Sequence, residues 1–133
     1  MRTLIDFLRL NRRRYPNHTA VVDNTSRLTY AELAERAYAV AAGLRNEGVQ
    51  RGETVGILAG NNNFFVEAYL GTLAAEAVPV LYNWRWAKPE LIFGVNDSLA
   101  RVVFVDQEFA PALAAARESG ELTHLRRVVT QGP

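Results

Sequence analysis

The sequence predicts an α/β fold in which a mainly parallel sheet is layered between helices. Two short apolar runs, Thr54–Ala59 and Ala77–Tyr82, have the continuous hydrophobicity of strands that are buried on both faces. Between them, Phe64–Ala75 is apolar around most of its circumference, as in a helix enclosed by other elements. Strand and helix patterns alternate along all 133 residues, so we expect residues 1–133 to form a single α/β domain.

One helix and two short strands are predicted at the start of the chain. Thr3, with an acidic residue three positions later, suits a helix start, and Pro16 ends that helix near Arg14. Ala20–Asp23 is predicted as a short strand, and Leu28 belongs to the next one after a polar turn.

The second helix has the clearest boundaries in the sequence. Thr29 and Glu32 form a capping-box pattern, in which the glutamate reaches back to the cap residue. Gly48 supplies the left-handed residue that ends the helix. Apolar residues recur between them at helical spacing, namely Leu33, Ala37, Val40 and Leu44.

After the strand Thr54–Ala59, the turn Gly60–Asn63 contains three asparagines, one of which we expect to cap the following helix. Pro79 cannot donate a hydrogen bond to a neighbouring strand, so it predicts a sheet edge or the start of a strand. The remaining predicted elements are a helix from Pro89 to about Asn96–Ser98, the strand Val102–Val105, the helix Glu108–Glu118 and the strand Arg127–Thr130.

The composition excludes several classes of function. A formal net charge of +1 offers no overall basic field for nucleic acid. The sequence has no cysteine, which excludes disulfides and thiolate metal sites and suits a reducing, cytoplasmic location. No apolar run reaches the ~18 residues that a membrane-spanning helix requires.

The N-terminal segment is both basic and amphipathic. A signal peptide is not expected, because charged residues interrupt the apolar stretch. Such a helix can lie on an anionic membrane surface, but we favour a packed helix with a solvated basic end, so that membrane contact is at most peripheral. The residues concerned are Leu4, Ile5, Phe7 and Leu8, followed by Arg9, Arg12, Arg13 and Arg14.

A search for catalytic, cofactor-binding and metal-binding patterns identifies none. The turn Gly60–Asn63 has one glycine, whereas dinucleotide and phosphate loops need several, so a capped turn is preferred there to an anion site. His18 and His124 lack metal-ligand spacing. The serines and the acidic residues Asp97, Asp106 and Glu108 have the positions of turn, cap and loop-end residues.

The loop after the second buried strand carries the only candidate site residues. Ligands of open α/β sheets bind beyond the carboxyl ends of strands, so this aromatic loop could form a pocket wall. Core or interface aromatics are an equally good interpretation. The candidate residues are Tyr82, Asn83, Trp84, Arg85 and Trp86.

Short motifs that resemble those of one known family follow one another in that family's order along most of the chain. They are Pro16–Val22, Leu28–Leu33, Gly48–Val55, then Asn61, Asn63, Phe65 and Ala68, then Leu70–Ala75, Ala77–Val80, Asn83, Arg85, Glu90–Leu91, Asp97–Ser98 and Ala100–Val102. In this order they resemble the N-terminal part of the adenylate-forming (AMP-binding) acyl-CoA synthetase superfamily, which includes fatty-acyl-CoA ligases, aryl-CoA ligases and luciferase-like enzymes.

The resemblance implies a truncated N-terminal subdomain of a larger ligase that uses ATP, Mg and CoA. The family's phosphate loop, magnesium motif, ribose-binding aspartate and catalytic lysine lie downstream, so no catalytic or cofactor residue is carried over to this chain. Two departures concern the small residue that the family usually has at Glu76 and the proline and leucine replaced here by Trp84 and Trp86. They affect the expected shape of a pocket near this loop.

The leading hypothesis is therefore a ligase fragment that is inactive on its own, with the remainder of the ligase as its partner. A second hypothesis is a non-catalytic interaction module that forms a homodimer through an exposed apolar face. A third is a small flavodoxin-like nucleotide-binding domain, which would need an anion site at Gly60–Asn63.

Overall fold

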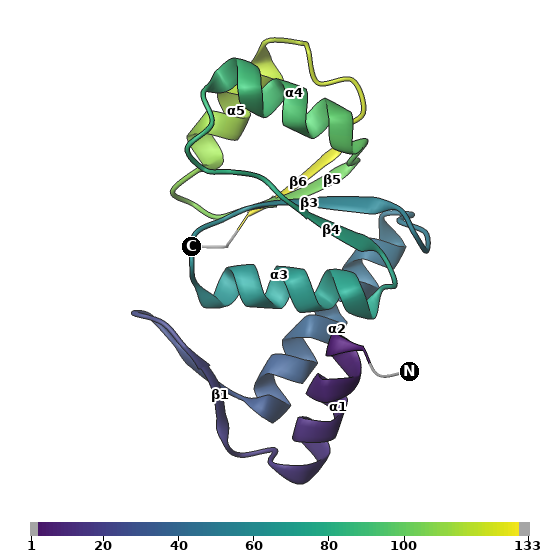
Figure 1. Cartoon of the computed structure of the whole chain (residues 1–133), viewed down its shortest axis with the longest axis vertical. Coiled ribbons are helices and arrows are strands. Elements are labelled where there is room, and N and C mark those ends of the chain that lie inside the picture. Colours follow the sequence, from purple (N-terminus) through teal and green to yellow (C-terminus); the bar gives the residue numbers. More distant parts are fainter. Residues whose placement is uncertain (1–2, 131–133) are drawn as a thin grey trace.

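A computed structural model describes residues 3–130 and shows a sheet enclosed by helices (Figure 1). Four parallel strands form this sheet in the order β4-β3-β5-β6, and β1 pairs with β2 in a separate antiparallel sheet. The strands are β1 (Thr19–Val22), β2 (Arg27–Thr29), β3 (Thr54–Leu58), β4 (Val78–Leu81), β5 (Val102–Val105) and β6 (Arg127–Thr130). The helices are α1 (Leu4–Arg14), α2 (Tyr30–Asn46), α3 (Asn63–Ala74), α4 (Lys88–Ser98) and α5 (Ala110–Glu118). The predicted α/β fold class is confirmed.

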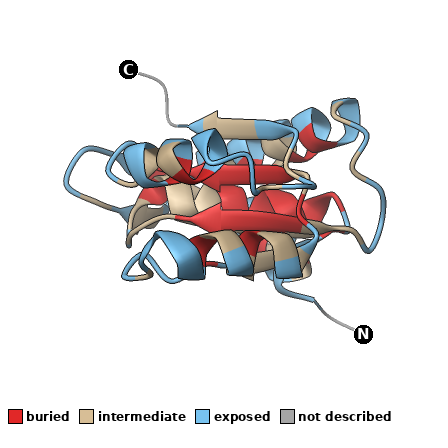
Figure 2. Cartoon of the chain, turned by 90° about the horizontal axis from the view of Figure 1, so that it is seen from above, coloured by how far each residue is buried: buried red, intermediate tan, exposed pale blue. Residues whose placement is uncertain are grey.

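The core lies on both faces of the sheet, because alternate residues of a strand point in opposite directions. Val102 and Phe104 of β5 pack in the cluster that contains α2 and α3, whereas Val103 and Val105 pack in the cluster that contains α4 and α5. Figure 2 shows buried residues concentrated on the central strands between exposed helical surfaces. The predicted run Val102–Val105 is therefore fully buried.

The central strand β3 pairs on both sides and requires a glycine at its midpoint. Gly56 lies opposite Val80 of β4 and Val103 of β5. The ring of Tyr82 passes so close that a Cβ on Gly56 would lie 2.4 Å from its Cε2 atom. A larger residue at this position would displace the aromatic ring that packs between β3 and α4.

Strand β4 is an outer strand, which corrects the expectation that Ala77–Tyr82 is buried on both faces. Val78 and Leu81 are about half exposed because only β3 pairs with this strand. The edge position agrees with the prediction made from Pro79, whose missing N–H costs no ladder hydrogen bond at an edge.

Local sequence signals determine most helix ends as predicted. The capping boxes at Thr3 and Thr29 are both formed, and the side chain of Asn62 accepts a hydrogen bond from the backbone N–H of Phe65. Gly48 has a φ of 85° after α2. The last helix begins at Ala110, two residues later than expected, because the preceding residues form a turn around Asp106.

Glu76 ends α3 in a conformation that usually requires glycine. Its φ is 62°, and the backbone N–H groups of Glu76 and Ala77 donate to the carbonyls of Leu73 and Thr72 in a Schellman arrangement. The carboxylate of Glu76 pairs with Arg51 at 3.2 Å, but both side chains are exposed, so the pair adds little stability. The small residue that the resemblance leads us to expect at position 76 thus has a backbone explanation.

None of the helices formed by residues 3–130 combines the length and the apolar character that crossing a bilayer would require.

The contact between α2 and α3 generates the first testable prediction. A Cβ on Gly71 would lie 2.3 Å from Cγ1 of Val40 and 2.9 Å from the backbone oxygen of Ala37, which cannot easily move. We expect Gly71→Ala to lower the free energy of unfolding by about 2 kcal/mol, measured by urea denaturation. Gly43→Ala is the matched control, because no atom lies within 4 Å of its added Cβ. The control should raise stability by about 1 kcal/mol, and equal effects of the two changes would contradict the prediction.

Candidate functional site

Three loops meet at the carboxyl edge of the sheet, where ligands of open α/β folds bind. They follow the neighbouring strands β4, β3 and β5, and they comprise residues 82–87, 59–62 and 106–109. The parallel strand directions bring these loops together although they are far apart in the sequence. This edge is the candidate site that the sequence predicted from the first of the three loops.

Tyr82 and Trp86, two of the five predicted residues, face the interior. Tyr82 is 5% exposed, and its hydroxyl lies 2.6 Å from Oγ of Ser98 in a hydrogen bond. Burial raises the pKa of Tyr82, and the hydrogen bond with Ser98 partly opposes that rise. Trp86 packs against α4 so closely that a Cβ on Gly94 would lie 2.4 Å from its ring. These two side chains hold the loop against α4.

Trp84 and Arg85 face outward from the same loop. Trp84 is 52% exposed, and its ring stacks on Phe109 with a centroid distance of 5.8 Å. The Arg85 guanidinium lies 4.9 Å from the Trp84 ring centre. Asn83 shapes the loop, because its side-chain oxygen accepts a hydrogen bond from the backbone N–H of Arg85 at 2.9 Å. The predicted group of five thus divides into two packing residues, one turn residue and an exposed cation–aromatic pair.

Asp106 connects two of the loops and was missed as a site residue by the sequence reasoning. Its buried carboxylate accepts hydrogen bonds from the backbone N–H of Gly60 at 2.8 Å and from the Asn62 amide at 3.1 Å. It also accepts from the backbone N–H groups of Glu108 and Phe109 at 3.1 and 3.3 Å. Its position directly after a buried strand is the one sequence signal that could have indicated this role.

The N-terminus of α3 is already occupied by acceptors from the chain itself. The backbone N–H of Asn63 donates to Oδ2 of Asp23 at 2.8 Å, while those of Phe65 and Val66 donate to the side chain and backbone of Asn62. A phosphate would have to displace these partners and approach the carboxylates of Asp23 and Asp106. The geometry therefore argues against the anion site that the flavodoxin-like hypothesis required at Gly60–Asn63.

Asp23 and Asn63 also fasten the antiparallel β1–β2 pair to the main sheet layer. Asn63 is buried, and its amide donates to the backbone oxygen and to Oγ of Ser26 at 3.2 and 2.6 Å. The backbone hydrogen bond from Asn63 is the main cause that holds the pKa of Asp23 well below its ordinary value, and hydrogen bonds from Thr25 and Ser26 add to the effect.

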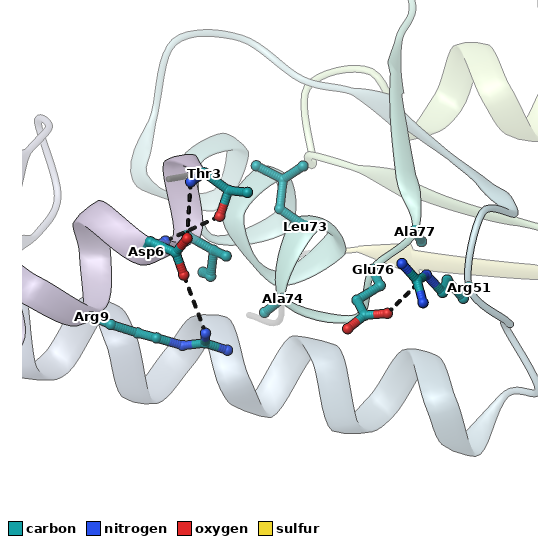
Figure 3. Close-up of a pocket in the computed structure, with 9 residues that line it drawn as sticks. Thr3, Asp6, Arg9, Arg51, Leu73, Ala74, Glu76 and Ala77 are labelled. Carbon is teal, nitrogen blue, oxygen red and sulfur yellow. Dashed lines mark hydrogen bonds and ion pairs between the residues drawn. The ribbon is translucent and has the colours of Figure 1, made fainter. Parts of the chain in front are cut away.

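A separate hollow of about 440 Å³ lies between α1 and the end of α3 (Figure 3). Four of its side chains form two ion pairs, Asp6 with Arg9 at 3.4 Å and Glu76 with Arg51 at 3.2 Å. The charges are balanced pair by pair, so this hollow has no net preference for an anion or a cation. Across residues 3–130, no three His, Cys, Asp or Glu side chains are grouped in a way that could hold a metal ion.

Comparisons with known proteins agree on one family. The family model described as "AMP-binding enzyme" matches residues 8–133. A feruloyl-CoA synthase from Amycolatopsis sp. is 39% identical over 100 residues, which cover 75% of this chain and 20% of that protein. A 3-hydroxybenzoate–CoA ligase from Aromatoleum sp. (strain CIB) is 34% identical over 113 residues, covering 85% of this chain and 21% of the relative.

A solved structure shares the same fold. It is the anthranilate CoA ligase AuaEII in complex with anthranoyl-AMP, with a TM-score of 0.91 and 30% identity, over 96% of this chain and 24% of that one. The chain thus spans about a fifth of the length of these two curated relatives and about a quarter of this solved structure.

The Asp23 contacts generate a prediction about acid stability. Since the pKa of Asp23 is lower in the folded state than in the unfolded state, its ionised form stabilises the fold above the ordinary value of 3.8. This contribution is lost as the pH falls from that value through the folded-state pKa. We expect Asp23→Asn to be less stable than the parent at neutral pH and to lose less stability on acidification, measured by urea denaturation at each pH.

Asp97→Asn is the matched control for the acid experiment, because no hydrogen bond to the exposed Asp97 side chain is found in the described part of the chain. A variant of Asp23 whose pH dependence follows that of the parent would show that the contacts with Asn63 and the β1–β2 turn do not stabilise the ionised form.

Proposed function

Because the chain belongs to the family of AMP-binding enzymes, we propose that it is the N-terminal part of an ATP-dependent acyl-CoA ligase and is inactive on its own. The observation that carries this proposal is the family match over residues 8–133, combined with a length about a fifth of that of the related ligases. The names of those relatives describe enzymes that join carboxylic acids to CoA.

The proposed whole enzyme would work in two steps and would use ATP, Mg and CoA. A carboxylate oxygen attacks the α-phosphorus of ATP, the bond to pyrophosphate breaks, and an acyl-adenylate forms. The sulfur of CoA then attacks the acyl carbon, and AMP leaves as the thioester forms. We place this reaction in the cytoplasm, in agreement with a sequence that has no cysteine.

The residues of this chain do not fit the phosphates of ATP or a magnesium ion. Backbone N–H groups at the N-terminus of α3 already donate hydrogen bonds to side chains of this chain, and the carboxylates of Asp23 and Asp106 lie beside this helix end. Stabilising a transferring adenylyl group requires positioned cations and donors. In the three loops at the carboxyl edge, residues 59–62, 82–87 and 106–109, the one guanidinium is that of Arg85, and it lies over Trp84. We propose that Trp84, Arg85 and Phe109 contact the remainder of the ligase, as an interface or as part of a pocket wall.

The inactivity of the isolated chain can be tested by isothermal titration calorimetry with Mg-ATP. We expect no saturable heat in the micromolar range, because the helix N-terminus that could accept a phosphate is closed by Asp23 and Asp106. A complete AMP-binding ligase titrated under the same conditions is the positive control. Saturable micromolar binding by the chain alone would overturn this part of the proposal.

The second candidate, a homodimerising module without catalytic activity, is favoured by the open edge of the sheet. Strand β4 pairs on one side only, and Val78 and Leu81 are 46% and 50% exposed on it. An outer strand with exposed apolar residues is a template for pairing with another chain. A second copy could therefore extend the sheet at β4.

Sedimentation velocity at rising concentration separates the two candidates. A dimerising module should form dimers, and Leu81→Lys should return it to the monomer because a charge would be buried in the new strand pair. Val22→Lys is the matched control, because Val22 is similarly exposed, at 55%, on the separate strand β1. A chain that remains monomeric at every concentration contradicts dimerisation and leaves the ligase fragment as the assignment.

A further inference from the structure

Helix α1 has two apolar faces, and only one of them is covered. Ile5 and Leu8 are buried in the core cluster against α2 and α3. Leu4 and Phe7 are 52% and 49% exposed and lie outside that cluster. The half-buried Leu10 continues this apolar stripe one turn beyond Phe7, because residues three apart share a helix face. A helix needs one apolar face to pack in a domain, so the second face is unexplained by the fold.

The exposed stripe is accompanied by unpaired positive charge. Arg9 is held by Asp6 and by the Tyr38 hydroxyl, to which its Nε donates at 2.6 Å. Arg12, Arg13 and Arg14 are exposed, and within residues 3–130 their side chains form no hydrogen bond or ion pair. With four arginines and one aspartate, α1 has a formal charge of +3, whereas the chain as a whole has +1. The rest of the chain is therefore net negative, and the positive charge is concentrated on this helix.

The apolar stripe and two of the unpaired arginines, Arg13 and Arg14, lie toward one side of α1, whereas Arg12 follows the buried Leu8 by four residues and lies on the other side. Arg14 follows Phe7 by two helical turns and lies on the same face. Phe7, Leu10 and Arg13 line a shallow hollow of about 280 Å³ together with the ion-paired Asp6 and Arg9. Figure 1 shows α1 at the end of the molecule opposite α4 and α5, with α2 and α3 between it and the sheet.

We propose that this face of α1, with Leu4, Phe7, Leu10, Arg13 and Arg14, docks on an anionic lipid bilayer. Apolar side chains of an in-plane helix enter the boundary between headgroups and acyl chains, while arginines remain among the anionic headgroups. The unpaired Arg13 and Arg14 provide the charge complementarity that favours lipid over an uncharged protein surface. The inference uses no catalytic feature of the proposed ligase, but it requires that the remainder of the ligase leaves this face of α1 uncovered.

Co-sedimentation with lipid vesicles tests the proposal. The chain should pellet with vesicles of phosphatidylglycerol and phosphatidylcholine, bind vesicles of phosphatidylcholine alone much more weakly, and be released by added salt. The variant Phe7→Asn with Arg14→Gln should bind the anionic vesicles roughly fiftyfold more weakly, about tenfold from the phenylalanine and about fivefold from the arginine. Both side chains are exposed, so circular dichroism should show an unchanged fold.

The matched control removes the same two kinds of side chain from the opposite end of the molecule. Phe93→Asn with Lys88→Gln changes an exposed phenylalanine and an exposed cation on α4, and it should leave vesicle binding unchanged. Equal binding to neutral and anionic vesicles, or an equal loss in the control, overturns the proposal. Self-association that depends on Phe7, without lipid binding, also overturns it and assigns the stripe to a second copy of the chain.

Discussion

The packing of the structure depends on how closely other side chains and helix α2 can approach the central unit of β3, α3 and β4. Gly56 allows the ring of Tyr82 to cross the middle of β3, and Gly71 allows α2 to pack directly on α3. At both positions even a methyl group would overlap with the neighbour. Burial of apolar surface drives the layers together, but these two glycines determine how near the layers come.

Two carboxylates complete the arrangement at the loop ends and also limit what the site can do. Asp106 joins the turn after β3 to the turn after β5, and Asp23 joins the β1–β2 turn to the start of α3. Both carboxylates accept hydrogen bonds from backbone N–H groups that a phosphate-binding fold would leave free for its ligand. The same hydrogen bonds that stabilise this part of the chain therefore make it a support for chemistry performed elsewhere in the proposed ligase.

Much of the fold could be predicted from the sequence, whereas the candidate site could be predicted only in outline. The predictions of helix caps at Thr3 and Thr29 and of an edge position for Pro79 were correct. The comparisons confirm the resemblance to AMP-binding ligases. The expectation that β4 is buried on both faces was wrong, because an apolar run does not show whether a strand has one neighbour or two. The predicted aromatic loop divides into inward and outward residues, and whether the outward pair forms a pocket wall or an interface stays a prediction.

The sequence by itself determined the features that arise from nearby residues: the helix caps, the order of helices and strands, and the family motifs. The Thr29–Glu32 capping box, for example, joins residues three positions apart. Tertiary structure alone decided the strand order, the closure of the α3 N-terminus and the exposure of a second apolar face on α1. Asp106 and Gly60 are 46 residues apart, and such contacts form only when distant strands are brought side by side by the packing of the whole sheet.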